Sequence, residues 1–291
     1  MPFALLPLWL AAAFLAFSAR PVVIAHRGAS GTNPEHTFAS YDRAIAMGAD
    51  YIEQDLQMTS DSVLVVLHDP TLNRTARGDA ADCTGRVIDH TLAQLRRCSA
   101  GQWFNERQPA LATPAFADAR IPTLEELFQR YGARANYYIE TKNPEDAPGM
   151  ERRLLGLVRQ YRLMPGEAPR GQVVVQSFSQ RSLRLVHELA PTLPLVQLLS
   201  EPIPRAALDS AFTEIARYAD GVGPDRKLVD SAFVASAHAH CLAIHPYTVD
   251  DERDMRRLLA LGVDGLFTNF ADRLRALAPG APAPMTPRCT R

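Results

Sequence analysis

Short apolar segments recur along this chain, and most of them are separated by segments with helical periodicity. The candidate strands are 22–25, 51–56, 63–67, 137–140, 173–176, 195–199, 220–222, 242–245 and 265–268. Helices are expected at 37–47, from residue 123 onward, at 179–189 and at 251–261, where capping residues or glycines mark the ends. Strands that alternate with helices in this way form a parallel sheet.

One connection breaks the alternation. Only residues 58–62 separate the second and third candidate strands, which is too short for a crossover helix, so these strands must form an antiparallel hairpin. If the turn centres between Ser60 and Asp61, His68 lies opposite Glu53. Without the return strand, eight strand-plus-connection units remain, the number that closes a TIM barrel. The predicted fold is therefore an α/β TIM (β/α)8 barrel with an antiparallel hairpin strand after its second strand.

Three regions fall outside the repeating units. Residues 70–121 contain scattered Gly and Pro and one helical patch at 92–97, which is typical of a small functional insertion, here expected to cover the barrel mouth. Residues 279–291 are rich in Pro and Ala and are predicted to be a disordered tail. Residues 1–19 contain a short apolar run, which predicts a signal peptide rather than a stable membrane span, although no basic residue precedes the run. A retained anchor is the alternative. The barrel domain then occupies 20–278.

The cysteines and the net charge restrict the environment of the protein. Cys83 and Cys98 are close enough in sequence to form a disulfide in an oxidising compartment, with two free thiols as the alternative. Cys241 is expected to be an unpaired core residue, and Cys289 falls in the predicted tail. With the export signal, this pattern favours a periplasmic or secreted protein. The net charge of −1 provides no basic field, so we expect no nucleic-acid partner.

Carboxylates end two of the predicted parallel strands. Glu53 and Asp55 are two residues apart and point to the same side of their strand, and Glu140 ends the next parallel strand. Carboxylates this close repel one another unless a cation neutralises them. All-oxygen ligation suits Mg²⁺ or Ca²⁺ better than zinc. We therefore predict one divalent cation, Ca²⁺ or Mg²⁺, at Glu53, Asp55 and Glu140.

Two cationic side chains and two histidines end the same group of strands. Arg27 and Lys142 exceed what a metal site needs, but they suit a phosphate bound above it. Cleavage of a phosphodiester requires one oxygen to lose a proton and another to gain one, which His26 and His68 can do. Each residue alone is common in loops or on solvated strand faces. Their shared position at the ends of buried strands favours a catalytic site. Which histidine is the base stays open.

These residues belong to a longer series of motifs. The motifs occupy 22–31, 34–37, 48–56, 58–61, 65–69, 72–74, 121–126, 140–142, 176–178, 245–249 and 262–269. Together they resemble the glycerophosphodiester phosphodiesterase family, and its exported bacterial, periplasmic-type branch in particular. The resemblance implies a TIM barrel with a small inserted region, a divalent cation, and release of sn-glycerol 3-phosphate and an alcohol. It assigns acid–base roles to the two histidines, metal ligation to the three carboxylates, and phosphate binding to Arg27 and Lys142.

Three positions depart from the pattern that the resemblance implies. His36 stands where Asn is common and is expected to be structural, with a third catalytic imidazole as the alternative. Tyr247 replaces Trp and still offers an aromatic wall for a glycerol unit, whereas Asn269 replaces Asp, which leaves its role open. Glu35 and Gln176 complete the expected pocket with Tyr247, and Glu35 is a candidate partner for Arg27, with a helix-terminus role as the alternative.

The predicted function is the metal-dependent hydrolysis of small, soluble glycerophosphodiesters. One alternative keeps the chemistry but changes the substrate, as in a lysophospholipase D or sphingomyelinase-D-like enzyme, which would need an apolar trough near the mouth. The other is a non-catalytic periplasmic binding protein for phosphate esters, which would need no proton-transfer pair. The head group, the choice between Ca²⁺ and Mg²⁺ and the oligomeric state stay open.

Overall fold

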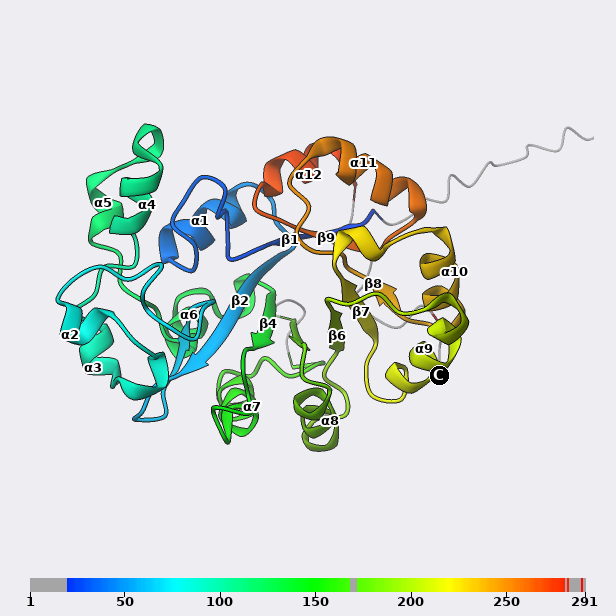
Figure 1. Cartoon of the computed structure of the whole chain (residues 1–291), viewed down its shortest axis with the longest axis horizontal. Coiled ribbons are helices and arrows are strands. Elements are labelled where there is room, and N and C mark those ends of the chain that lie inside the picture. Colours follow the sequence, from blue (N-terminus) through cyan, green and yellow to red (C-terminus); the bar gives the residue numbers. More distant parts are fainter. Residues whose placement is uncertain (1–19, 168–171, 281, 283–288, 290–291) are drawn as a thin grey trace, which may run out of the picture.

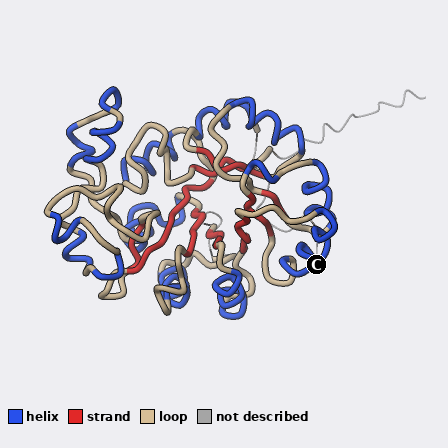
Figure 2. The backbone as a smooth tube through the Cα atoms, in the orientation of Figure 1, coloured by secondary structure: helices blue, strands red, loops and turns tan. Residues whose placement is uncertain are grey.

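A ring of parallel strands surrounded by helices forms the body of the protein in the computed structural model, which describes residues 20–167, 172–280, 282 and 289 (Figures 1 and 2). The parallel strands are β1 (Val22–Ala25), β2 (Tyr51–Met58), β4 (Tyr137–Thr141), β5 (Val173–Ser177), β6 (Leu195–Leu199), β7 (Gly221–Pro224), β8 (Ala243–Ile244) and β9 (Gly265–Thr268). They pair in the order β8-β7-β6-β5-β4-β2-β1-β9. The predicted TIM barrel is confirmed.

Backbone hydrogen bonds between the two ends of this series complete the ring. The Phe267 N–H donates to the carbonyl of Pro246, and the Asp264 N–H donates to the carbonyl of Ile244, each at 3.0 Å. The first bond lies just beyond the short strand β8, and the second is accepted by its last residue. The carboxyl ends of all eight strands therefore face one shared mouth, as in any barrel of this class.

The helices cover the outside of the ring (Figure 2). They are α1 (Phe38–Ala46), α6 (Leu124–Tyr131), α7 (Met150–Gln160), α8 (Gln180–Leu189), α9 (Leu208–Ile215), α10 (Ser231–Ala239), α11 (Glu252–Leu261) and α12 (Ala271–Leu277), with 3₁₀ turns η3 (Gly132–Arg134), η4 (Arg205–Ala207) and η5 (Arg226–Leu228). The four helices expected from capping signals all form. Thr123 and Glu126 make a capping box at α6, and α11 runs from the N-cap Asp251 to Gly262 in the left-handed conformation.

A small apolar cluster inside the barrel sets the level of the polar residues above it. Ile24, Tyr51, Tyr138 and Val174 belong to this buried cluster, separate from the main core between strands and helices. Because side chains repeat every two residues along a strand, the residue two positions further on points to the same interior. The next interior positions are His26, Glu53, Glu140 and Gln176, so the strand pattern directs these polar side chains into the barrel mouth.

Strand β3 (Leu64–Val66) pairs antiparallel with β2, which confirms the hairpin but not its predicted register. Leu56 pairs with Val66 and Met58 with Leu64, one residue away from the predicted pairing. The turn contains three residues rather than two, because Thr59 and Val63 pair by a 3.0 Å backbone bond and Ser62 adopts a left-handed φ of 63°. The turn is therefore centred on Asp61.

The insertion after β3 lies at the side of the barrel rather than over its mouth (Figure 1). It contains α2 (Ala80–Cys83), η1 (Val87–Asp89), α3 (Leu92–Leu95), α4 (Gln102–Arg107), η2 (Pro109–Leu111) and α5 (Pro114–Ala117). Val65 and Leu67 of the hairpin pack into its separate apolar cluster, while Leu64 and Val66 pack into the barrel core. The two faces of β3 thus hold the insertion beside the mouth, and the expectation of a cover was wrong.

Two disulfides join the described cysteines. Cys83 and Cys98 are bonded within the insertion, as the first alternative predicted. Cys241 is bonded to Cys289, 48 residues away in sequence, so the expectation of an unpaired core cysteine was wrong. Cys241 is only partly buried and follows α10 with a left-handed φ of 63°, which turns it away from the core.

The predictions for residues 1–19 and for most of the tail 279–291 lie outside the described residues. Within the described part of the chain, the helices are too short or too polar to cross a membrane.

Candidate active site

A cavity of about 280 Å³ opens at the carboxyl ends of the strands. Its walls are formed by His26, Arg27, Glu53, Asp55, His68, Glu140, Lys142, Gln176, Phe178, Leu198, Tyr247, Thr248 and Phe267. The structure thus gathers the residues predicted for acid–base, metal and phosphate roles, together with Gln176 and Tyr247. Glu35 lies one contact away, bonded to Arg27. His68 reaches the cavity despite the shifted hairpin register, because it lies beyond the end of β3.

The three carboxylates line the cavity together, on the neighbouring strands β2 and β4. Glu53 and Asp55 are almost fully buried, and Asp55 pairs in register with Glu140 on the neighbouring strand. Burial, with the nearby charge of Asp55, raises the pKa of Glu53 well above its usual range and that of Glu140 to about 8. Burial opposes ionisation of Asp55 as well, but Lys142, His36 and Arg27 outweigh it and hold the pKa of Asp55 well below its usual range.

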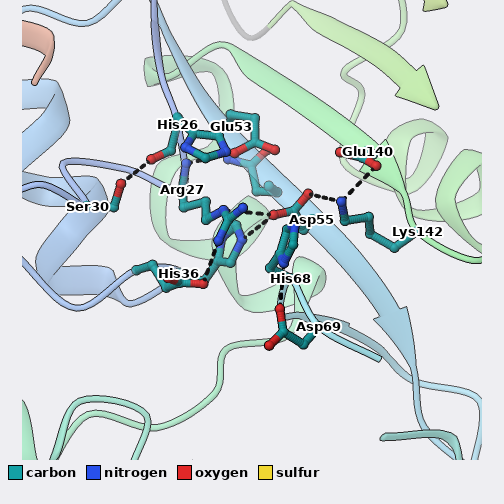
Figure 3. Close-up of polar contacts among 12 residues, drawn as sticks. His26, Arg27, Ser30, His36, Glu53, Asp55, His68, Asp69, Glu140 and Lys142 are labelled. Carbon is teal, nitrogen blue, oxygen red and sulfur yellow. Dashed lines mark hydrogen bonds and ion pairs between the residues drawn. The ribbon is translucent and has the colours of Figure 1, made fainter. Parts of the chain in front are cut away.

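Both cationic side chains are directed at these carboxylates (Figure 3). The Arg27 backbone N–H donates to Glu53 at 2.7 Å, and its guanidinium lies 3.1 Å from Glu35 and 3.4 Å from Asp55. Lys142 Nζ lies between two carboxylates, 3.0 Å from Glu140 and 3.6 Å from Asp55. The carboxylates therefore orient both cations at the cavity wall, where each still has room to meet an anion.

The conformation of Arg27 depends on a tight turn after β1. Arg27 and Gly28 both adopt left-handed backbone conformations, with φ of 56° and 81°. A side chain at Gly28 would place its Cβ 2.5 Å from Ser40 Oγ, so only glycine fits against α1. This turn directs the Arg27 backbone N–H toward Glu53.

His26 is held by an amide. Its Nδ1 lies 2.8 Å from Asn269 Oδ1, and Asn269 is fixed in turn because its Nδ2 donates to Asp250 at 2.7 Å. An amide oxygen only accepts, so His26 Nδ1 carries the proton and Nε2 is left with a free lone pair. Burial, aided by the charge of Arg27, lowers the pKa of His26 to about 3. The sequence left the role of Asn269 open, and the structure shows that it sets the tautomer of His26.

His68 is held by a carboxylate. Its Nδ1 lies 2.6 Å from Asp69 Oδ1, and Arg74 donates to both oxygens of Asp69. The Arg74 and His68 hydrogen bonds overcome burial and lower the pKa of Asp69 to about 2, so this partner is ionised near neutral pH. Burial and the nearby cations lower the pKa of His68, while Asp55 and Asp69 oppose them.

His36 lies closer to the chemistry than expected. Its left-handed φ of 56° turns the imidazole inward from the start of α1, where Nε2 lies 2.8 Å from Asp55 and Nδ1 lies 2.8 Å from the Tyr41 hydroxyl. His36, Glu53 and Asp55 form a group whose potential ligand atoms lie within 4.8 Å of one another and could hold a metal ion. The sequence named Glu140 as the third ligand, and a backbone with positive φ at His36 was not readable from the motif.

An aromatic pair, Phe178 and Tyr247, lines another part of the cavity. Phe178 is 45% exposed and meets Tyr247 edge to face at 5.9 Å. The Tyr247 hydroxyl donates to the carbonyl of Leu199 at 3.0 Å, which leaves the apolar side of the ring for the cavity. Phe178 ends the 176–178 motif, but the sequence did not predict it as a pocket residue. Aromatic and charged side chains in one cavity suit a substrate that carries both apolar and charged groups.

Comparisons with known proteins identify the family. The model of the glycerophosphoryl diester phosphodiesterase family matches residues 26–273. A glycerophosphodiester phosphodiesterase of Bacillus subtilis is 48% identical over 261 residues, which span 90% of this chain and 87% of that protein. The chain therefore belongs to the glycerophosphoryl diester phosphodiesterase family. The predicted enzyme class, a glycerophosphodiester phosphodiesterase, is confirmed.

Solved structures agree with this assignment. A phosphodiesterase of Oleispira antarctica, in complex with its product sn-glycerol-3-phosphate, is 25% identical with a TM-score of 0.73, covering 88% of this chain and 96% of that one. The glycerophosphodiester phosphodiesterase of Agrobacterium tumefaciens is also 25% identical, with a TM-score of 0.69, covering 88% of this chain and 99% of that one.

Proposed function

We propose that this enzyme hydrolyses small glycerophosphodiesters to sn-glycerol 3-phosphate and an alcohol by acid–base catalysis with His26 and His68, assisted by a divalent cation. The observation that carries the proposal is the shared cavity, in which two differently supported imidazoles face a group of carboxylates and two cations. Proton transfer at both ends of the scissile bond requires two such groups, whereas simple binding does not.

The support of each histidine suggests its role. His26 presents an unprotonated Nε2, since its Nδ1–H is committed to the neutral amide of Asn269, so it is suited to take a proton from the attacking oxygen. His68 has an ionised carboxylate partner in Asp69, which stabilises the imidazolium form and suits it to protonate the departing alkoxide. Arg27 and Lys142 would bind the non-bridging phosphate oxygens and stabilise the charge that develops on them.

The carboxylate cluster fits a hard divalent cation. Burial and the neighbouring charge of Asp55 raise the pKa values of Glu53 and Glu140, and the buried Oε1 of Gln176 has no hydrogen-bond partner among the described residues. Glu53, Asp55 and Glu140 would hold the cation, and His36 is a further candidate ligand, because its potential ligand atom lies within 4.8 Å of those of Glu53 and Asp55. A bound Ca²⁺ or Mg²⁺ would act as a Lewis acid on the phosphate.

The dimensions of the cavity favour a small substrate. About 280 Å³ accommodates glycerol, a phosphate and a small head group. Phe178 and Tyr247 would contact the apolar edge of the glycerol unit. A lysophospholipase D would need an additional apolar trough for its acyl chain, and the insertion that could have supplied one lies at the side of the barrel (Figure 1).

We further propose that the protein is exported to the periplasm or secreted. Disulfides persist in oxidising compartments, and the two found here support this location. Fractionation of the native host, with sequencing of the mature N-terminus, tests it. Reduced protein in the cytosol with residues 1–19 intact would contradict the proposal.

An assay of glycerol 3-phosphate release, combined with an assay of choline release for lysophosphatidylcholine, tests the function. Glycerophosphocholine, glycerophosphoethanolamine and lysophosphatidylcholine are compared, each with Ca²⁺, Mg²⁺ or EDTA. We expect turnover of the first two substrates only, and only with a metal. Tight binding of glycerophosphocholine without turnover would instead favour the binding-protein alternative, and hydrolysis of lysophosphatidylcholine would favour the lysophospholipase alternative.

A further inference from the structure

The insertion reaches the active site through Arg74. This residue lies shortly after His68, and its guanidinium contacts two carboxylates on different segments. Nη1 and Nη2 donate to the two oxygens of Glu35 at 2.8 and 2.7 Å. Nε and Nη2 donate to the two oxygens of Asp69 at 2.7 and 3.1 Å. One planar fork therefore holds two carboxylates in a set orientation.

Each of these carboxylates holds a functional side chain. Glu35 Oε1 also accepts a hydrogen bond from Arg27 Nη1 at 3.1 Å, and Asp69 Oδ1 accepts one from His68 Nδ1 at 2.6 Å. The contacts form a continuous chain from Arg27 through Glu35, Arg74 and Asp69 to His68. The phosphate-binding arginine and the proposed acid thus share a single anchor, although they follow different strands.

Arg74 is itself supported by the insertion. Its guanidinium carbon lies 5.9 Å from the centre of the Trp103 ring, and Trp103 is a buried residue of α4. The apolar cluster of the insertion includes both Leu72, two residues before Arg74, and the disulfide-bonded Cys83. The insertion therefore provides a rigid base from which Arg74 extends toward the barrel.

We propose that Arg74 is a positioning residue that sets the spacing between Arg27 and His68, and that this is how the insertion contributes to catalysis. The inference rests on the phosphate-binding and acid–base roles proposed above. Without Arg74, Glu35 has only Arg27 to pair with and draws its guanidinium away from the phosphate, while Asp69 no longer holds the His68 imidazole at a fixed angle. A displacement of about 1 Å in such a group can cost a factor of about 100 in rate.

The test compares Arg74→Met with Arg96→Met. Arg96 is a matched control, because it lies in the same insertion, is exposed to a similar degree (31% against 32%) and pairs with Glu126 of the barrel helix α6. For Arg74→Met we expect kcat to fall and KM for glycerophosphocholine to rise, with kcat/KM reduced about 10- to 100-fold. Arg96→Met should lower the melting temperature as much as Arg74→Met does, but its kcat and KM should stay at the wild-type values.

Two further variants separate the contact of Arg74 with Glu35 from its contact with Asp69. Glu35→Gln should mainly raise KM, because it acts through Arg27, whereas Asp69→Asn should mainly lower kcat, because it acts through His68. Combining Arg74→Met with Asp69→Asn should lower kcat little beyond Arg74→Met alone, since both act through one contact. Millimolar guanidinium chloride should restore part of the activity of Arg74→Ala, and Arg74→Lys should recover little, because an ammonium cannot bridge both carboxylates.

Wild-type kinetics in Arg74→Met, or full activity in Arg74→Lys, would overturn the inference. If Arg74→Met does not fold, Arg74→Lys and the guanidinium rescue decide the question. His68→Ala distinguishes this failure from a failure of the proposed function. If His68→Ala is inactive and Arg74→Met is fully active, only the proposed role of Arg74 is wrong. If His68→Ala is fully active, the acid–base assignment is wrong, and this inference is wrong with it.

Discussion

The two histidines of the cavity are supported by different regions of the molecule. His26 is buried against the barrel, with the neutral Asn269 as its partner and Asp250 behind it. His68 is partly exposed at the side of the insertion, with the ionised Asp69 as its partner and Arg74 behind it. Burial lowers the pKa of His26 to about 3, whereas the Asp69 hydrogen bond opposes the lowering of the His68 pKa by burial and nearby cations. Two identical side chains acquire complementary proton-transfer properties from their neighbours.

The acidic cluster between the two histidines gives the largest expected effect. Chelation of the divalent cation should abolish turnover and lower the melting temperature, because a cation bound only by the native state stabilises it, by about 2.7 kcal/mol at 100 times its Kd. Metal affinity should weaken as the pH falls below about 8, since Glu140 must lose its proton to ligate. Calorimetric titration of Ca²⁺ and Mg²⁺ at several pH values checks this. Unchanged activity in EDTA would contradict it.

Removal of either histidine tests the comparison directly. His26→Ala and His68→Ala should each lower kcat by a factor of about 100 to 10,000, the usual contribution of a positioned acid or base. Circular dichroism should show an intact fold, because neither side chain belongs to the apolar core. Near-normal rates in both variants would refute the acid–base assignment.

Because the two histidines have different partners, replacing the partner of His68 should move only one limb of the pH–rate profile. Asp69→Asn gives His68 a neutral partner of the kind that His26 already has. Because the Asp69 hydrogen bond raises the pKa of His68, its removal should lower that pKa. The proton of the acid is then lost at lower pH, so the alkaline limb of the kcat profile should shift to lower pH, with kcat near neutrality reduced about tenfold. The acid limb should stay in place. A pH–rate profile measures both limbs, and an unmoved alkaline limb would argue that His68 is not the acid.

Loosening the insertion should give the smallest effect on turnover. Cys98→Ser opens a loop closed over 15 residues, which should destabilise the protein by about 3 kcal/mol. Turnover should fall only severalfold, because Arg74 and Asp69 keep their direct contacts. The matched variant Cys241→Ser opens the other disulfide, on the far side of the barrel, and should lower stability without changing kcat. Denaturant unfolding and steady-state kinetics separate the two quantities.

Much of the fold could be predicted because it depends on local signals. The apolar strands, the caps at Thr123 and Asp251 and the short connection after β2 all lie within a few residues of the structure that they determine. The predicted cavity residues came together for the same reason. Two-residue spacing along a strand carries each side chain from the apolar interior to the mouth.

The errors have a different origin. The predicted hairpin register was wrong by one residue. The amino-acid sequence does not distinguish a two-residue turn from a three-residue turn that ends at Ser62. The contact of the His36 ring with Asp55 was not predicted, because the left-handed backbone conformation that brings them together carries no sequence signal.

The sequence by itself determined the barrel, the hairpin and the set of charged side chains at the strand ends, since periodicity and capping act over short distances. Only the tertiary structure decided which partners those side chains meet. Asn269 is 243 residues from His26, Arg74 is 39 residues from Glu35 and Cys289 is 48 residues from Cys241. Contacts over such separations exist only once the ring of strands has closed, and they determine the proton positions and the orientation on which the proposed chemistry depends.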